Sequence, residues 1–227
     1  MFSGVEKFTF CCVCGKKSGA FVCRTCEIEP FPPWFKCPQC GSLGQLPCFI
    51  CELQPLKMGR IMWFSTYPEG IHLVKKLKFE NKFVLGSYIA KHILNVYEET
   101  LRQRVYDTVV LAPVSKTGFF ARGVNHLCLI AAPIAKALNA KLVDPFVKRN
   151  DGKRETILLK KQISGLRILF IDDVLTTGLT LKLCLRLMPR SVKFVDALFF
   201  LVSYPHILAR PLFRTILNRA WVLRGAI

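Results

Sequence analysis

From residue 62 onward, short apolar runs alternate with amphipathic segments. Apolar runs of strand length occur at Thr108–Ala112, at Arg167–Ile171 and, interrupted by Asp196, at Phe194–Val202. Between them, apolar residues recur every three or four positions, which is the spacing of a helix with one buried face. Buried strands that alternate with helices are typical of a parallel β-sheet covered by helices on both faces. We therefore predict an α/β fold.

The same pattern predicts five further elements. A strand is expected at Met62–Tyr67, and helices are expected at Ile71–Phe79, Phe83–Leu101, Val124–Leu138 and Gly178–Met188. Pro133 should kink the third of these helices. Ligands of parallel sheets bind beyond the carboxyl ends of the strands. The loops after Ala112 and Ile171 are therefore the places where we expect a ligand site.

The loop after Ile171 has the composition of a site for a sugar phosphate. Asp172 and Asp173 end the strand, and the turn Thr176–Thr180 opens the next helix. The carboxylates can accept hydrogen bonds from two neighbouring sugar hydroxyls, and the turn offers hydroxyls and backbone N–H groups to a phosphate. Gly178 lets the backbone approach that phosphate closely. A strand followed by an acidic turn without function seldom combines both acids with three threonines.

This segment resembles the phosphoribosyl pyrophosphate (PRPP) motif of type I phosphoribosyltransferases. The loop Ala112–Lys116 has the place and composition of the loop that holds the pyrophosphate, although alone it could equally be an ordinary turn. The charge of a diphosphate also calls for Mg²⁺. The resemblance implies PRPP-binding residues at Asp172, Asp173, Val174, Leu175, Thr176, Thr177, Gly178 and Thr180, and at Val114, Ser115, Lys116 and Arg122.

The N-terminal region is rich in cysteine: nine of the eleven cysteines lie within the first 51 residues. Two residues between cysteines let both thiolates bind one tetrahedral ion, and two such pairs complete a structural zinc site. A disulfide scaffold would need an oxidising compartment, and a redox-active pair does not explain four pairs in tandem. The predicted zinc ligands, enough for two ions, are Cys11, Cys14, Cys23, Cys26, Cys37, Cys40, Cys48 and Cys51.

Three points about this zinc-binding module stay open. Cys12 could replace Cys11 as a ligand, and the cysteine pairs could bind one or two ions. An ion could also take its ligands from both the first two and the last two pairs. We expect the module to span residues 1–56, followed by an α/β domain at 57–203 and a basic tail at 204–227. The tail mixes apolar residues with arginines, so it could lie on a membrane surface, pack against the domain or have no role.

The chain carries a formal charge of +18. Each four-thiolate zinc site would bring about −2, which leaves about +14. Such a surface attracts polyanions, among them nucleic acids and phosphate-rich ligands. The sequence has no apolar run of the length of a transmembrane helix or a signal peptide, so we expect a cytoplasmic protein.

The cysteine module, the tripeptide Leu77-Lys78-Phe79 and the segment Arg122–Asn125 together are similar to the ComF (ComFC) family of competence-associated proteins. The resemblance implies a double zinc ribbon fused to a phosphoribosyltransferase fold. It also implies a role in natural transformation, where single-stranded DNA is handled with other competence proteins at the inner face of the cytoplasmic membrane. The chain departs from the family between Phe146 and Ser164, where a mobile basic loop without the usual Thr-x-x-Gln is expected. This loop could close over pyrophosphate, or it could equally be a solvated run of charges.

Three functions are compatible with these features. The first is a PRPP-binding protein that handles single-stranded DNA, for which basic and aromatic residues at Lys75–Phe83 could supply phosphate contacts and stacking surfaces. The second is a phosphoribosyltransferase, for which the sequence indicates no acceptor site. The third is a PRPP-sensing regulator that binds without turnover. We favour the first.

Overall fold

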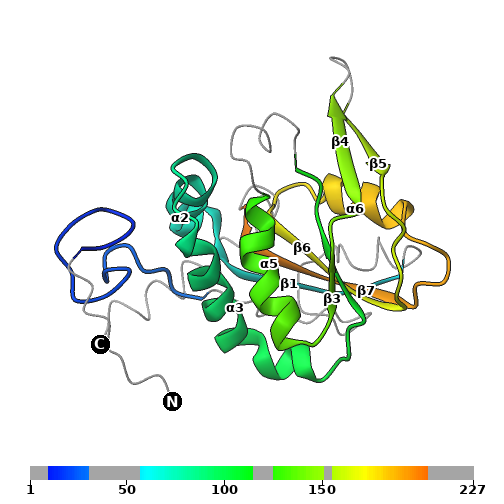
Figure 1. Ribbon diagram of the computed structural model, residues 1–227, viewed down its shortest axis with the longest axis horizontal. Helices are drawn as coiled ribbons and strands as arrows, with labels where there is room; N and C mark the ends of the chain where they lie inside the picture. The colour runs from blue at the N-terminus through cyan, green and yellow to red at the C-terminus, as the bar shows by residue number, and fades with distance from the viewer. Residues whose placement is uncertain (1–9, 31–56, 115–124, 151–154, 204–227) are drawn as a thin grey trace, which may run out of the picture.

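A five-stranded parallel β-sheet forms the centre of the molecule (Figure 1). The computed structural model describes residues 10–30, 57–114, 125–150 and 155–203. The strands lie in the order β1-β7-β6-β2-β3, and every neighbouring pair is parallel. They are β1 (Met58–Thr66), β2 (Thr108–Leu111), β3 (Lys141–Val143), β6 (Arg167–Leu175) and β7 (Phe194–Val202). The predicted fold class is confirmed.

Helices cover both faces of this sheet. They are α2 (Tyr67–Phe79), α3 (Val84–Arg102), α5 (His126–Ala137) and α6 (Leu179–Arg186). In Figure 1, α2, α3 and α5 lie on one side of the sheet and α6 lies on the other. Right-handed crossovers require this division, because the connections through α2, α3 and α5 run across the sheet in one direction and the connection through α6 runs back. Pro133, where a kink was expected, lies inside α5.

Strand β6 is longer than its apolar run predicted. It continues past Ile171 to Leu175, because β7 runs beside it and pairs Asp172 with Phe199 and Leu175 with Val202. On its other side, β2 ends at Leu111, which pairs with Ile171. The two acidic residues therefore lie within a strand that projects beyond β2, and the predicted end of this strand at Ile171 was wrong.

The segment Phe146–Ser164, expected to be a mobile loop, contains an antiparallel hairpin. Its strands are β4 (Phe146–Asn150) and β5 (Glu155–Leu159). Phe146 and Ile157 are buried and fix the hairpin to the core, which overrides the polar composition of the segment. Because β4 starts three residues after β3 ends, the hairpin rises from the edge of the sheet where the strands have their carboxyl ends (Figure 1).

The opposite, amino edge of the sheet is fastened by one buried carboxylate. Asp196 of β7 is fully buried and accepts hydrogen bonds from the Tyr106 hydroxyl at 2.7 Å and the backbone N–H of Arg60 at 2.7 Å. Arg104 adds an ion pair at 3.2 Å. Burial raises the pKa of the Asp196 carboxyl, against the effect of these partners. They join β1 and β7 to the chain that enters β2.

None of the helices in the described part of the chain combines the length and the apolar character needed to span a bilayer.

The contact between α3 and α5 depends on a glycine, and this dependence can be tested. A Cβ atom on Gly86 would lie 2.4 Å from the Leu129 Cβ and 2.9 Å from the Leu129 carbonyl oxygen, so the helices would have to separate. We expect Gly86→Ala to lower the free energy of unfolding by about 1–3 kcal/mol, as overpacking does, measured by urea denaturation. Ser87→Ala at the neighbouring exposed position is the control, and equal stability of both variants would contradict the packing argument.

Candidate functional site

The carboxyl edge of the sheet gathers the described residues of the predicted PRPP site. Asp172 and Asp173 lie near the end of β6, the turn Thr176–Thr180 follows it, and Val114 follows the neighbouring strand β2. The side chain of Leu175 is buried and that of Val174 packs against the core. Ser115, Lys116 and Arg122 lie outside the described residues.

Asp173 is buried between two helices that reach the edge from different parts of the chain. Its Oδ2 atom forms an ion pair with the ammonium of Lys78, from the last turn of α2, and lies 2.9 Å from Nε2 of His126, the first residue of α5. The residue is only 7% exposed. Although burial alone would raise the pKa of Asp173, the hydrogen bond from His126 and the charge of Lys78 hold it well below its usual range. Asp173 is therefore an ionised carboxylate that Lys78 and His126 hold in place.

Asp172 points to the other face of the sheet. Successive side chains of a strand alternate between faces, and the carboxylate of Asp172 acts on Cys184 of α6: burial, and then this carboxylate, raise the pKa of Cys184. Asp172 is partly exposed, and its Oδ1 accepts a hydrogen bond of 2.8 Å from the backbone N–H of Asp173. Burial and the neighbouring Asp173 charge raise the pKa of Asp172. The two acids thus differ in their partners and in the direction in which their pKa is shifted.

The turn after β6 leads into α6 through a glycine with positive φ. Gly178 adopts a left-handed conformation with φ of +71° and caps the start of α6. A side chain at this position would be strained, which explains the glycine. Thr176 and Thr177 are exposed, and the hydroxyl of Thr177 accepts a hydrogen bond of 3.3 Å from the Leu179 N–H. Hydroxyls and the positive end of α6 thus face solvent beside Asp172.

Lys78 and His126 were not predicted as site residues. Lys78 interrupts the apolar spacing of α2 between Leu77 and the exposed Phe79, but a lysine in a last helical turn is usually solvated. His126 follows Asn125, whose side chain caps α5 by accepting a 3.0 Å hydrogen bond from the Leu127 N–H. Both residues carried a weak signal, because Lys78 lies within a motif that we quoted for the family resemblance and His126 directly follows another.

Four cysteines form a second site at the N-terminal end of the described chain. One ligand atom each of Cys11, Cys14, Cys23 and Cys26 lies within 4.8 Å of the others. A tetrahedral zinc ion with Zn–S bonds of about 2.3 Å holds its sulfurs about 3.8 Å apart, and the Cys14 and Cys23 sulfurs are 3.7 Å apart. The four thiols therefore could bind a zinc ion.

The arrangement answers one question that the spacing left open. Cys11, not Cys12, belongs to the cluster, and the backbone N–H groups of Val13 and Cys23 both point at its sulfur from 3.4 Å. Burial would raise the pKa of the Cys11 thiol, but these and other backbone N–H groups lower it to about 6, which favours the thiolate that zinc binds. The predicted ligands Cys37, Cys40, Cys48 and Cys51 lie outside the described residues.

The cysteine segment is fastened to the α/β domain through α2, α3 and β1. The ring of His72 in α2 lies 3.0 Å from the backbone oxygen of Cys26, and the Ser65 hydroxyl donates to the Glu29 carbonyl at 2.9 Å. The rings of Phe21 and Tyr88 pack with their centroids 6.0 Å apart. The segment thus rests on the same helix, α2, that carries Lys78.

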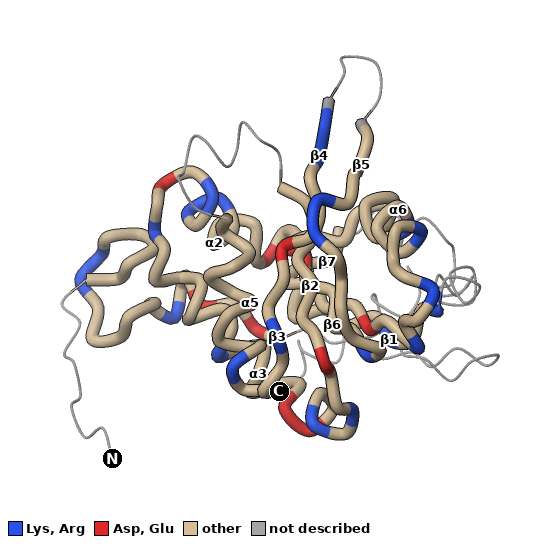
Figure 2. The backbone as a smooth tube through the Cα atoms, turned by 45° about the vertical axis from the view of Figure 1, so that its right-hand side comes forward, with Lys and Arg blue, Asp and Glu red and all other residues tan. Residues whose placement is uncertain are grey.

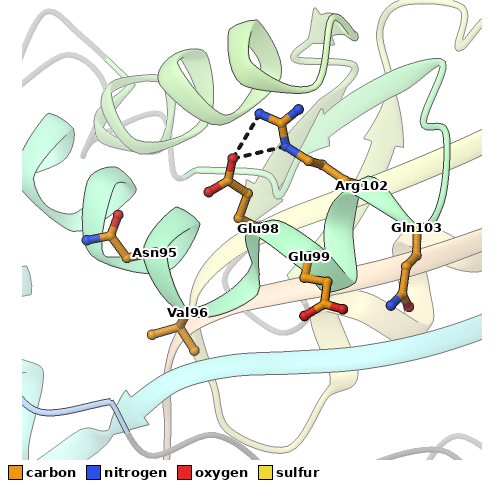
Figure 3. A pocket seen from close by; sticks show the side chains of 6 residues that line it. All are labelled: Asn95, Val96, Glu98, Glu99, Arg102 and Gln103. Atoms are coloured by element: carbon orange, nitrogen blue, oxygen red, sulfur yellow. Dashed lines mark hydrogen bonds and ion pairs between the residues drawn. The ribbon is translucent and has the colours of Figure 1, made fainter.

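A surface hollow on α3 is not part of either site. It is lined by Asn95, Val96, Glu98, Glu99, Arg102 and Gln103 (Figure 3). Glu98 and Arg102 form an exposed ion pair at 2.8 Å with helical spacing, which is common on helix surfaces. The hollow lies on the half of α3 that leads to the start of β2, and so towards the amino edge, away from Asp172.

Comparisons with known proteins find relatives that are named for DNA utilization and for competence. No protein-family model matches the chain. The DNA utilization protein YhgH of Escherichia coli is 23% identical over 192 residues, which cover 75% of this chain and 85% of that protein. Its counterpart in Salmonella typhimurium is 26% identical with the same coverage. Competence protein F of Haemophilus influenzae is 22% identical over 188 residues, 71% of this chain and 81% of that protein.

Among solved structures, a purine phosphoribosyltransferase from Pyrococcus horikoshii is similar over 50% of this chain and 81% of its own, with 15% identity and a TM-score of 0.36. A hypoxanthine-guanine phosphoribosyltransferase from Bacillus anthracis covers 55% of this chain with a TM-score of 0.34. The assignment of the fold rests on the strand order and the parallel register described above.

The composition of the cysteine cluster can be tested by counting zinc. We expect Cys14→Ser to bind one zinc ion fewer per chain than the wild type, because a serine hydroxyl is a poor replacement for a thiolate ligand. Cys12→Ser, a matched change next to the cluster, should keep the wild-type content. Zinc is measured by atomic emission or with a chromogenic chelator after unfolding. Zinc loss in Cys12→Ser with retention in Cys14→Ser would refute the assignment.

Proposed function

The chain belongs to the ComF family of competence-associated proteins, and from this we propose that it is a zinc-containing, PRPP-binding protein that handles single-stranded DNA during natural transformation. The observation that supports the proposal most is the end of β6, where Asp172 and Asp173 lead into a turn capped by left-handed Gly178. The proposal includes a zinc module at residues 1–56, a domain at 57–203 and a tail at 204–227. It places the protein in the cytoplasm, at the inner face of the membrane where DNA enters.

For PRPP, each part of the edge has a distinct role in the proposal. The ribose hydroxyls bind at Asp172 and Asp173, and the 5′-phosphate lies against the turn Thr176–Thr180 and the positive end of α6. The diphosphate lies at the loop that begins with Val114, with Ser115, Lys116 and Arg122 as further ligands. Mg²⁺, bound with the ligand, would neutralise part of the diphosphate charge.

For DNA, the charge and one exposed aromatic residue support the proposal. The chain has 33 Lys and Arg against 15 Asp and Glu, and Figure 2 shows Lys and Arg on α2 and on β4. Lys75 and Lys82 are exposed at and after the end of α2, and the Phe79 side chain between them is 73% exposed. Ammonium groups around an exposed ring suit a single strand, whose phosphates bind the cations while its bases stack.

A phosphoribosyltransferase is the second candidate, because the same groups would orient the ribose while positive charge develops on it. A PRPP sensor would use the site without turnover. Release of pyrophosphate in the presence of nucleobases and amines distinguishes these two functions from each other. Proteins of the competence machinery are the proposed partners.

Binding of PRPP is tested by isothermal titration calorimetry with Mg²⁺ present. We expect Asp172→Ala to weaken PRPP binding by about tenfold or more, because hydrogen bonds to the ribose hydroxyls are lost. Glu99→Gln, which removes an acidic charge from the far hollow on α3, should bind like the wild type. Equal affinity of Asp172→Ala and wild type would contradict the proposed site. If Asp172→Ala also loses DNA, the two ligands share a site.

Binding of DNA is tested through its dependence on salt, with a fluorescent oligothymidine. Each phosphate contact adds about 0.7 to the slope of log affinity against log salt for a single strand. We therefore expect Lys75→Gln/Lys82→Gln to reduce this slope by about 1.4. Lys141→Gln/Lys193→Gln, two exposed lysines at the amino edge, is the control with the same change of charge. An affinity that does not fall with salt would argue against DNA as a ligand.

A further inference from the structure

Lys78 forms an ion pair that the stability of the fold does not explain. Its side chain is 24% exposed and that of Asp173 is 10% exposed, so both charges have lost most of their water. Such pairs add little stability, because the cost of desolvation roughly offsets the attraction. Helix α2 is already held by Leu73, Val74 and Leu77, which are at most 2% exposed. The pair therefore indicates a role at the site.

Without Lys78, the carboxyl edge would repel the ligand proposed for it. Asp172 and Asp173 are adjacent carboxylates, and PRPP brings several negative charges of its own. The ammonium of Lys78 cancels the charge of Asp173, and burial together with the Asp173 charge raises the pKa of Asp172. The edge thus keeps hydrogen-bond acceptors for hydroxyls without a net negative field that would exclude an anion.

The position of Lys78 places it beside one part of the proposed ligand, the diphosphate. Asp173 faces α2 and α5, and α5 starts where the connection from β2 ends. The turn at Gly178, proposed for the 5′-phosphate, opens α6 on the opposite face. Lys78 therefore lies on the half of the edge that begins with the β2 loop, which is the half proposed for the diphosphate.

From this placement, we propose that Lys78 is a diphosphate-binding residue of the PRPP site. The inference rests on the proposed function and deepens it. His126 is a positioning residue: the Asp173 carboxylate accepts hydrogen bonds from His126 and Lys78 and so holds the ammonium at the edge. A lysine is a compact charge with three donors and can bind a carboxylate and a phosphate oxygen together.

The test compares two ligands that differ only in the diphosphate. Wild type and Lys78→Gln are titrated with PRPP and with ribose 5-phosphate, both with Mg²⁺. We expect Lys78→Gln to weaken PRPP binding by about tenfold or more, the effect of one charge-assisted hydrogen bond, and to weaken ribose 5-phosphate binding by a clearly smaller factor, because the 5′-phosphate lies on the α6 face. Lys76→Gln, two residues earlier on α2 and paired with Glu80, is the matched control and should affect neither ligand.

Retained binding of ribose 5-phosphate also shows that the variant is folded. If Lys78→Gln does not fold, Lys78→Arg keeps the charge and the contact with Asp173 but displaces the donors, and it should still weaken PRPP selectively. The inference is overturned if a folded variant loses both ligands by the same factor, or if Lys78→Gln binds PRPP like Lys76→Gln. Failure of the wild type to bind PRPP at all is a different result, because it removes the proposed function itself.

Discussion

The arrangement of the candidate site depends on one buried carboxylate. Asp173 lies in a central strand, and an ionised group there needs partners that replace the water it has lost. Lys78 and His126 supply them, and each comes from a different helix on the same face of the sheet. The carboxylate thereby fixes the end of α2 and the start of α5 relative to β6. A packed apolar side chain would fill the same space without specifying which polar groups meet at the edge.

The sequence predicts the fold and the β6–α6 part of the site because local rules govern both. An apolar strand, two acids and a glycine that must adopt positive φ lie within eleven consecutive residues, so no long-range contact is needed to recognise them. β3 has three residues and only one is buried, which leaves too little pattern to detect. The hairpin β4–β5 depends on the burial of Phe146 and Ile157 by residues far away in the chain.

The partners of Asp173 could not be predicted for the same reason. Lys78 and His126 precede it by 95 and 47 residues, and only the packing of α2 and α5 on one face of the sheet brings them together. The choice of Cys11 over Cys12 is also a matter of three-dimensional direction, since two adjacent cysteines have the same chemistry. Spacing indicates that a metal site is possible, whereas the backbone N–H groups around the Cys11 sulfur indicate which thiol takes part.

Helix α2 joins the two sites of the molecule, since it contacts the backbone of Cys26 through His72 and the carboxylate of Asp173 through Lys78, six residues later. The cysteine segment is therefore not an interchangeable module. Any other N-terminal domain grafted onto this α/β domain would have to supply an acceptor for His72 and a partner for the Tyr88 ring. Recombination of such domains during evolution is thus constrained by the surfaces of α2 and α3, which limits how freely this α/β domain can exchange its N-terminal extension.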